Sequence, residues 1–260
     1  MSKKPVYILA IESSCDDTAA AVLCDTQVLS NVIANQEIHA QYGGVVPELA
    51  SRAHQQNIVP VVAQALKEAK ISKSQLNAIA FTQGPGLMGS LLVGASFAKS
   101  LSMGLGIPLL AINHMQAHVL AHFIKDTAQK NPQFPFLCLT ISGGHTQIVK
   151  LTDYFNFEIL GQTTDDAVGE AFDKSAKILG LDYPGGPLVD KYAQMGDPLA
   201  FKFPIPKTKK ALDFSFSGLK TAILYFIQKK IKEDSDFIKN NRNDICASIQ
   251  HTITTILMQK

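Results

Sequence analysis

Apolar and polar residues follow two patterns along the chain, short β-branched runs typical of strands and longer stretches with helical spacing. Strands that alternate with helices indicate an α/β protein. The sequence predicts strands at residues 6–12, 18–23, 28–34, 78–82, 108–112, 136–141, 146–151 and 157–160. It predicts helices at residues 48–70, 87–103, 114–124 and 166–179, with a short helix after Pro187 and two more beyond it.

The chain separates into two halves at a polar connector, residues 125–133, which ends before Phe134. Each half opens with a strand, a polar turn and a second strand, at residues 6–23 and 136–151. This repetition predicts two lobes, 1–133 and 134–260, whose opening hairpins face one shared cleft.

The predicted helix 166–179 has a start signal and a stop signal. Asp165 or Asp166 is its expected N-cap, and Gly180 its expected C-cap. The last predicted helix, from Asn243, is still periodic at Lys260, with no glycine or proline to stop it. We therefore expect the chain to end within a helix.

The composition is that of a globular protein, with 46% hydrophobic and 18% charged residues. The formal net charge of +2 argues neither for nor against nucleic acid. Four cysteines without a CxxC pair predict buried free thiols in a reducing compartment. The first apolar run ends at Glu12 and is too short for a signal peptide, so a soluble cytoplasmic protein is expected.

Two histidines four residues apart, His114 and His118, would project from one face of the predicted helix and could share a metal ion. His122 lies another turn along the same face. A metalloprotease needs a glutamate directly after the first histidine, and here that residue is Met115. The spacing leaves a metal pair and two unconnected polar residues both open.

Glycine-bearing turns at residues 84–86, 142–145 and 184–187 leave backbone N–H groups accessible to phosphate oxygens and together favour a nucleotide cleft. A P-loop is excluded, because no GxxxxGK[ST] motif occurs. Glu12 ends the first strand and could hold a metal-bound water or orient a nucleophile. Asp173 lies within an apolar helix, where a solvent-facing position is the alternative.

Several motifs together resemble the family of the bacterial tRNA threonylcarbamoyladenosine synthase transferase subunit, formerly called O-sialoglycoprotein endopeptidases. In order along the chain they are AIESSCDDT at 10–18, YGGVVPELASRAH at 42–54, GPG at 84–86, NHMQAH at 113–118, SGGHTQ at 142–147, DD at 165–166, GEAFDK at 169–174, LDYPGGP at 181–187 and DFSFSGLKT at 213–221.

The resemblance implies an actin-like (sugar kinase/Hsp70-type) fold with two lobes around a cleft. The implied reaction moves a threonylcarbamoyl group from threonylcarbamoyl-adenylate to the N6 amine of the adenosine next to the anticodon, in tRNAs that read codons beginning with A. His114 and His118 fall on metal-ligand positions for one divalent ion, Fe2+ being the expected metal. Glu12 is expected to be catalytic, and the expected substrate-binding residues are Thr140, Ile141, Ser142, Gly143, Gly144, Asp173, Gly186 and Asp190.

The resemblance also implies accessory subunits, among them a paralogue of the same fold and a small ATPase, and no membrane. The family continues beyond Lys260 with a substrate-binding Asn and an Asp that completes the metal site. We therefore expect residues 1–260 to transfer little or no threonylcarbamoyl group. The alternatives are an ATPase or kinase of the same fold and a non-catalytic scaffold. The histidine pair separates them from the transferase, because a kinase does not need it and the scaffold paralogues lack it.

Overall fold

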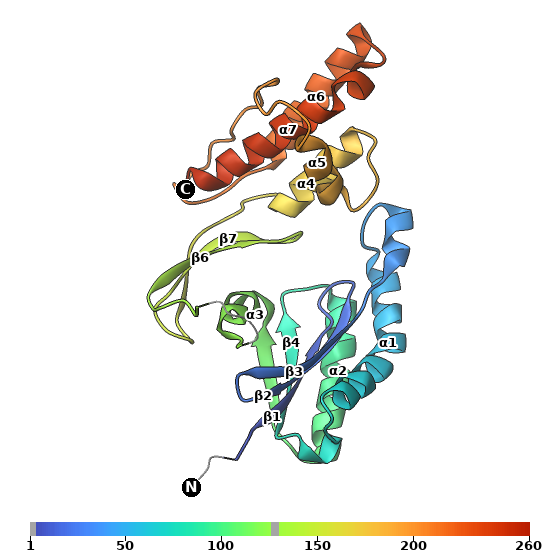
Figure 1. The fold of residues 1–260 in the computed structure, drawn as a ribbon, viewed down its shortest axis with the longest axis vertical. Helices are drawn as coiled ribbons and strands as arrows, with labels where there is room; N and C mark the ends of the chain where they lie inside the picture. Colours follow the sequence, from blue (N-terminus) through green and yellow to red (C-terminus); the bar gives the residue numbers. More distant parts are fainter. Residues whose placement is uncertain (1–3, 126–129) are drawn as a thin grey trace. The chain divides into compact units, whose positions relative to one another are not determined.

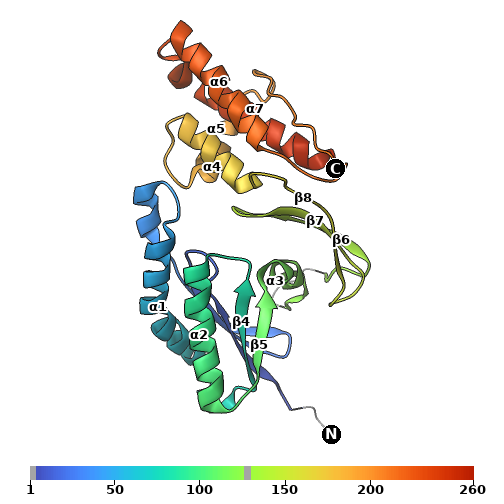
Figure 2. The ribbon, with the colours of Figure 1, turned by 180° about the vertical axis from the view of Figure 1, so that it is seen from behind.

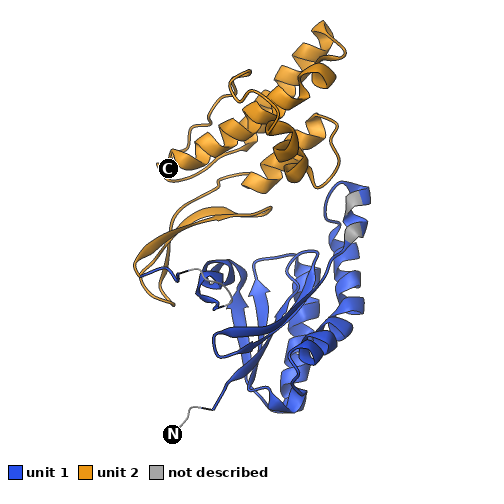
Figure 3. Ribbon diagram, viewed as in Figure 1, with its two compact units in different colours: residues 1–133 blue, residues 134–260 orange. Residues whose placement is uncertain are grey.

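The computed structural model describes residues 4–125 and 130–260. It divides into two compact units, Met1–Gln133 and Phe134–Lys260 (Figure 3). The predicted connector at 125–133 falls partly on residues 126–129, which lie outside the described residues. A shared cleft between the two opening hairpins stays a prediction.

A five-stranded sheet organises unit 1, with the strand order β3-β2-β1-β4-β5 (Figure 1). β1 and β2 pair antiparallel, as do β2 and β3, whereas β4 runs parallel to both β1 and β5. This is the strand order of one half of the actin-like fold that the resemblance implies. The strands are β1 (Tyr7–Glu12), β2 (Thr18–Cys24), β3 (Gln27–Ala34), β4 (Ala78–Gly84) and β5 (Leu109–Asn113).

Two long helices, α1 (Pro47–Glu68) and α2 (Met88–Leu105), lie side by side on one face of this sheet (Figures 1 and 2). Alternation along β1 buries Leu9 and Ile11 on the helix-facing side, because successive strand side chains point to opposite faces. The core between sheet and helices also contains Ala20, Val22, Ile58, Val61, Val62, Ala65, Ile79 and Ala98.

The connections of unit 1 carry its shorter elements. They are the 3-10 helices η1 (Glu37–Tyr42) and η2 (Lys73–Gln75), then α3 (His114–Leu120) and η3 (Ala121–Phe123) directly after β5. The predicted helix 114–124 is thus α-helical only as far as Leu120. Gly106 ends α2 with a left-handed φ of 64°, a conformation that favours glycine.

Unit 2 opens with an antiparallel three-stranded sheet, β6 (Phe136–Ile141), β7 (Thr146–Leu151) and β8 (Phe157–Gln162). Four helices follow, α4 (Val168–Ile178), α5 (Gly185–Ala193), α6 (Ser217–Glu233) and α7 (Phe237–Met258). The prediction for α7 began six residues too late, because its first turns are polar and carry little apolar periodicity. The helices pack around a core that includes Val189, Phe214, Phe216, Leu219, Ile223, Ile227, Ile245, Ile249 and Ile253.

All four cysteines are free thiols. Cys246 is buried, and Cys24 and Cys138 are half-buried, but Cys15 is exposed because it lies in the turn after β1. The expectation of burial is therefore wrong for Cys15. Among the described helices, none has the length and apolar character needed to cross a membrane.

The predicted N-cap of α4 is wrong. Ala167 is the N-cap residue and makes no side-chain cap hydrogen bond, while Gly180 adopts the expected left-handed φ of 70° just past the end of the helix. Asp165 instead serves the N-terminus of α6: its Oδ1 accepts hydrogen bonds from the backbone of Phe216 (2.7 Å) and Ser217 (3.1 Å). Its Oδ2 accepts from the hydroxyls of Ser215 and Ser217.

Replacing Asp165 by Asn should destabilise unit 2 by about 1–2 kcal/mol near neutral pH, as for the loss of a helix cap. Burial raises the pKa of Asp165, but the hydrogen bonds from Ser215, Phe216 and Ser217 outweigh it and lower the pKa. Because the folded pKa lies below the unfolded value, the contribution is present above the unfolded pKa and is lost as pH falls through the folded one. Denaturation followed by circular dichroism should show the difference at pH 7 and a smaller difference at a pH below the ordinary aspartate pKa of 3.8.

The matched control is Asp182→Asn, an exposed carboxylate for which the described part of the chain shows no hydrogen bond. It should change the free energy of unfolding little at either pH. An Asp165→Asn effect of equal size at both pH values would contradict this assignment.

Candidate active site

The register of the unit 1 sheet places two polar side chains together where β1 and β4 end. β1 pairs in parallel with β4 through Ala10 and Ala80. Two residues further along each strand, Glu12 and Thr82 therefore project from the same face. β5, on the other side of β4, ends at Asn113, so His114 begins α3 at this same edge.

The Glu12 carboxylate joins three chain segments at this edge. Its Oε1 accepts a hydrogen bond from the backbone N–H of Ser14. Its Oε2 accepts from the hydroxyl of Thr82 and lies 3.3 Å from Nδ1 of His114. The hydroxyl of Ser14 is also 3.3 Å from that Nδ1. Both carboxylate oxygens are thus engaged by groups from three different elements.

Burial raises the pKa of Glu12, but the hydrogen bonds from His114, Ser14 and Thr82 together outweigh it and lower the pKa to about 2. Glu12 is consequently a carboxylate near neutral pH, and it accepts hydrogen bonds there rather than donating one. Burial, and then the neighbouring His114, lower the pKa of His118. A neutral imidazole is the form that binds a metal.

His114 and His118 lie one turn apart on α3, with their Nε2 atoms 3.0 Å apart. Asn113 fixes the start of this helix, because its Oδ1 accepts hydrogen bonds from the backbone of Met115 (2.9 Å) and Gln116 (3.1 Å). His122 makes a different contact, from Nδ1 to the carbonyl of Val119 at 3.0 Å. The structure therefore pairs the first two histidines and leaves the third out of the pair.

The histidine pair fits two ligands of a metal ion. Nitrogens at right angles around a metal with bonds of about 2.1 Å are about 3 Å apart, close to the separation found here. Metal-binding histidines commonly donate their other ring N–H to a carboxylate, and Glu12 lies at that position beside His114. Within residues 4–125 and 130–260, however, no group of three or more His, Cys, Asp or Glu side chains could hold a metal.

The turn that carries Ser14 is fixed to both long helices. Backbone N–H of Leu87 donates to the Ser14 carbonyl (2.7 Å), and the hydroxyl of Ser90 donates to the Cys15 carbonyl (3.0 Å). A Cβ on Gly86 would lie 2.5 Å from the Ser14 carbonyl oxygen, so only glycine allows this approach. From α1, the fully buried His54 reaches the same turn.

Sequence reasoning missed His54, which lies between the turn and β2. Its Nε2 is 3.0 Å from the Cys15 carbonyl oxygen and its Nδ1 is 2.7 Å from the Thr18 hydroxyl. Because a carbonyl only accepts, Nε2 carries the proton and Nδ1 accepts from Thr18. Thr82 and Ser14 were missed as well. Thr82 is the last residue of a predicted strand, and Ser14 lies within the motif at residues 10–18, but neither position indicated a contact with Glu12.

In unit 2, the turn between β6 and β7 is closed by Ser142 and His145 through a 2.9 Å backbone hydrogen bond. Gly143 and Gly144 have ordinary φ values, and a Cβ on either would meet nothing within 4 Å. The fold does not require glycine at these two positions, so their open space is available to a ligand. Gly169, in contrast, is required by the fold, because a Cβ there would lie 2.8 Å from the Cα of Gly143.

Asp173 and Gly186 come together where α4 meets α5. Oδ1 of Asp173 accepts hydrogen bonds from the backbone of Gly185 (2.8 Å) and Gly186 (3.3 Å) and so caps α5. Asp190, one turn along α5, accepts from the side chains of Gln194 and Gln250, each at 3.0 Å.

The last two predicted substrate-binding residues lie on β6. Ile141 is exposed, and Thr140 is buried with a hydroxyl that has no hydrogen-bond partner in the described part of the chain.

Comparison with known proteins assigns the chain to a family. A family model described as TsaD, tRNA N6-adenosine threonylcarbamoyltransferase, matches residues 27–260. A relative of that name from Christiangramia forsetii is 70% identical over 260 residues, covering 100% of this chain and 76% of the relative. The chain belongs to the tRNA N6-adenosine threonylcarbamoyltransferase family.

Membership of the tRNA N6-adenosine threonylcarbamoyltransferase family makes the chain a tRNA-modifying transferase and disfavours the kinase and scaffold alternatives. A second relative of the same name, from Porphyromonas gingivalis, is 59% identical over 260 residues and covers 99% of this chain and 76% of its own length. Among solved structures, YeaZ from Pseudomonas aeruginosa is 20% identical and covers 60% of this chain and 65% of its own, with a TM-score of 0.40.

Replacing His54 tests whether the turn position matters for transfer. In His54→Gln the amide nitrogen stands in for Nε2 and keeps the bond to the Cys15 carbonyl. In His54→Asn the amide stands in for Nδ1 and loses that bond. A lost buried hydrogen bond costs about 1–3 kcal/mol. If that cost falls on the turn geometry needed in the transition state, kcat falls about 5- to 160-fold in the Asn variant and much less in the Gln variant.

KM for tRNA should stay unchanged in both variants. His39→Gln is the control for loss of a buried imidazole, since His39 is 1% exposed and contacts Gln36 and Val46 rather than the turn. Equal kcat in the Gln and Asn variants of His54 would rule out this positioning role.

Proposed function

We propose that the chain takes the threonylcarbamoyl group from threonylcarbamoyl-adenylate and attaches it to N6 of the adenosine beside the anticodon, in tRNAs reading codons that begin with A. N6 attacks the carbamoyl carbon, the bond from that carbon to the AMP phosphate oxygen breaks, AMP leaves and N6 loses one proton. The observation that carries this proposal is the Nε2 pair of His114 and His118, 3.0 Å apart and backed by Glu12, in a chain of this family.

His114 and His118 would supply two of the ligands to a divalent metal, Fe2+ being the ion we propose. Such an ion, when bound, would act as a Lewis acid toward the carbamoyl carbonyl. Glu12 acts through His114: by accepting from Nδ1 it would fix the ring so that Nε2 faces the metal. We therefore propose a positioning role for Glu12 in place of the directly catalytic role expected from the sequence.

The donor adenylate would be held by unit 2. The open backbone of Ser142–Gly144 suits a phosphate, because its glycines carry no side chain to keep the ligand away. The N–H groups of Gly185 and Gly186 already bond to Asp173, so the start of α5 is less available to an anion. Carboxylates accept hydrogen bonds from hydroxyls, so Asp173 and Asp190 suit the ribose. Thr140 and Ile141 would flank the phosphate-binding turn.

His114→Ala should reduce bound iron and abolish measurable transfer, because one of two adjacent ligands is lost. The measurements are metal content after anaerobic reconstitution and incorporation of labelled threonine into tRNA from the supplied adenylate. His122→Ala, in the 3-10 helix η3 directly after α3, is the matched control and should retain both metal and activity. Iron content that stays the same in His114→Ala would remove this metal assignment.

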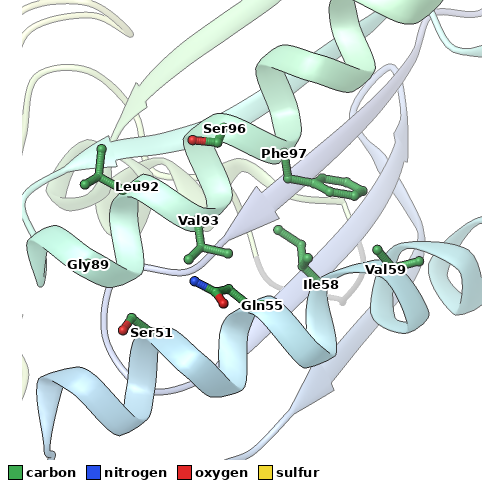
Figure 4. A pocket seen from close by; sticks show the side chains of 9 residues that line it. All are labelled: Ser51, Gln55, Ile58, Val59, Gly89, Leu92, Val93, Ser96 and Phe97. Carbon is green, nitrogen blue, oxygen red and sulfur yellow. The ribbon is translucent and has the colours of Figure 1, made fainter.

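Accessory subunits would include a paralogue of the same fold and a small ATPase. For the paralogue we propose the outer face of α1 and α2, where a groove is lined by Ser51, Gln55, Ile58, Val59, Gly89, Leu92, Val93, Ser96 and Phe97 (Figure 4). Val59 is 60% exposed and Leu92 57%, and Met88 nearby is 72% exposed. A same-fold partner carries an equivalent pair of helices, which could pack against these two as a four-helix layer.

We also propose that the protein works in the cytoplasm, where tRNA and free thiols are found.

Leu92→Glu should abolish co-purification with the paralogue, because a charge would be buried in the packed layer. Met103→Glu, on the same helix and 73% exposed but outside the groove, should leave binding intact. Size-exclusion chromatography of the mixed subunits measures both. An intact complex with Leu92→Glu would place the partner elsewhere.

A further inference from the structure

Residues 201–212 lie within the connection between α5 and α6, residues 194–216, and their first end is fixed in the apolar core of unit 2. The half-buried Phe201 and Phe203 both contact the ring of Phe226, with centroids 5.2 Å and 5.5 Å apart. The backbone N–H of Phe201 also donates to the hydroxyl of Ser248 at 3.1 Å.

The second end of the segment is fixed to the sheet. The backbone of Phe214, which is fully buried, donates to the Gln162 carbonyl at 3.0 Å. Oδ1 of Asp213 accepts from the backbone of Gln162 at 3.2 Å. Pro204 and Pro206 restrict the backbone between the two ends. The segment is thus held in place rather than tethered loosely.

The side chains displayed between these anchors are cationic. Lys202, Lys207, Lys209 and Lys210 are exposed, and residues 201–212 contain no Asp or Glu. None of the four lysines has an ion pair in the described part of the chain, whereas Lys174 pairs with Asp166 and Glu170. Four uncompensated positive charges here exceed the +2 of the whole chain. The surface is therefore strongly positive locally on a nearly neutral protein.

We infer that residues 201–212 form a contact surface for the phosphate backbone of the substrate tRNA. Lysine ammonium groups neutralise phosphates without reading bases, so such a surface supplies affinity and orientation rather than choice of nucleotide. Fixing the segment at both ends lowers the entropy lost when its lysines engage the RNA. This inference rests on the proposed function, since it takes tRNA to be the acceptor.

The test is the affinity for tRNA of the triple variant Lys207→Gln, Lys209→Gln, Lys210→Gln, measured over a range of salt concentrations. Each phosphate contact contributes about 0.7–0.9 to the slope of log K against log salt. We expect the magnitude of this negative slope to decrease by about 2 and the Kd at about 0.1 M salt to rise by about tenfold or more. kcat at saturating tRNA should be unchanged, and the corresponding triple Arg variant should bind like the unmodified chain.

The matched control replaces Lys229, Lys232 and Lys239 by Gln. These residues are also exposed and lie on α6 and α7 of the same unit. Loss of three charges at these positions should leave the salt slope unchanged. Equal slopes for the two Gln variants, or an unchanged Kd in the first, would overturn the inference. If the unmodified chain bound tRNA but transferred nothing even when extended by the C-terminal residues of its longer relatives, the proposed function would fail instead.

Discussion

The Glu12 carboxylate is the interaction on which the candidate site of unit 1 depends. It accepts hydrogen bonds from the turn after β1, from the end of β4 and from the first residue of α3. A carboxylate has enough lone pairs to serve all of these donors at once. Parallel strands bring their carboxyl ends to one edge of the sheet, and Glu12 turns that proximity into a fixed geometry for His114.

The turn that follows Glu12 is also held by hydrogen bonds from several elements. Its carbonyls are bound by Leu87 and Ser90 of the α2 region and by His54 of α1. The two helices that cover the sheet therefore also hold the residues next to the histidine pair. A substitution in either helix can reach the site through hydrogen bonds alone, without touching a metal or a substrate.

The element order and most boundaries could be predicted from the sequence, because β-branched runs and helical spacing are strong where a face is buried. β6 and β7 begin and end at the predicted residues. Caps were harder: Asp165 has the right chemistry for a helix start, yet it serves α6, about 50 residues away. Long-range partners of that kind have no local signature.

The residues of the candidate site could also be predicted only where their signal is local in the sequence. His114, His118 and Glu12 were visible as motif residues, since spacing and strand ends are local properties. His54 ends the motif at residues 42–54, but nothing along the chain indicates that its ring meets the carbonyl of Cys15, 39 residues earlier. Cys15 was expected to be buried and is exposed, because an apolar run alone does not reveal where the turn after it emerges.

We propose that the Nε2 atoms of His114 and His118 hold the metal used in transfer. Anomalous diffraction at the iron edge, on crystals of the protein reconstituted with Fe2+, tests it most directly. We expect one iron peak within about 2.0–2.2 Å of both Nε2 atoms, the range of metal–imidazole bonds, with Glu12 still accepting from Nδ1 of His114. An iron peak bound by other residues, or a protein that transfers threonylcarbamoyl groups with no metal at this pair, would contradict it.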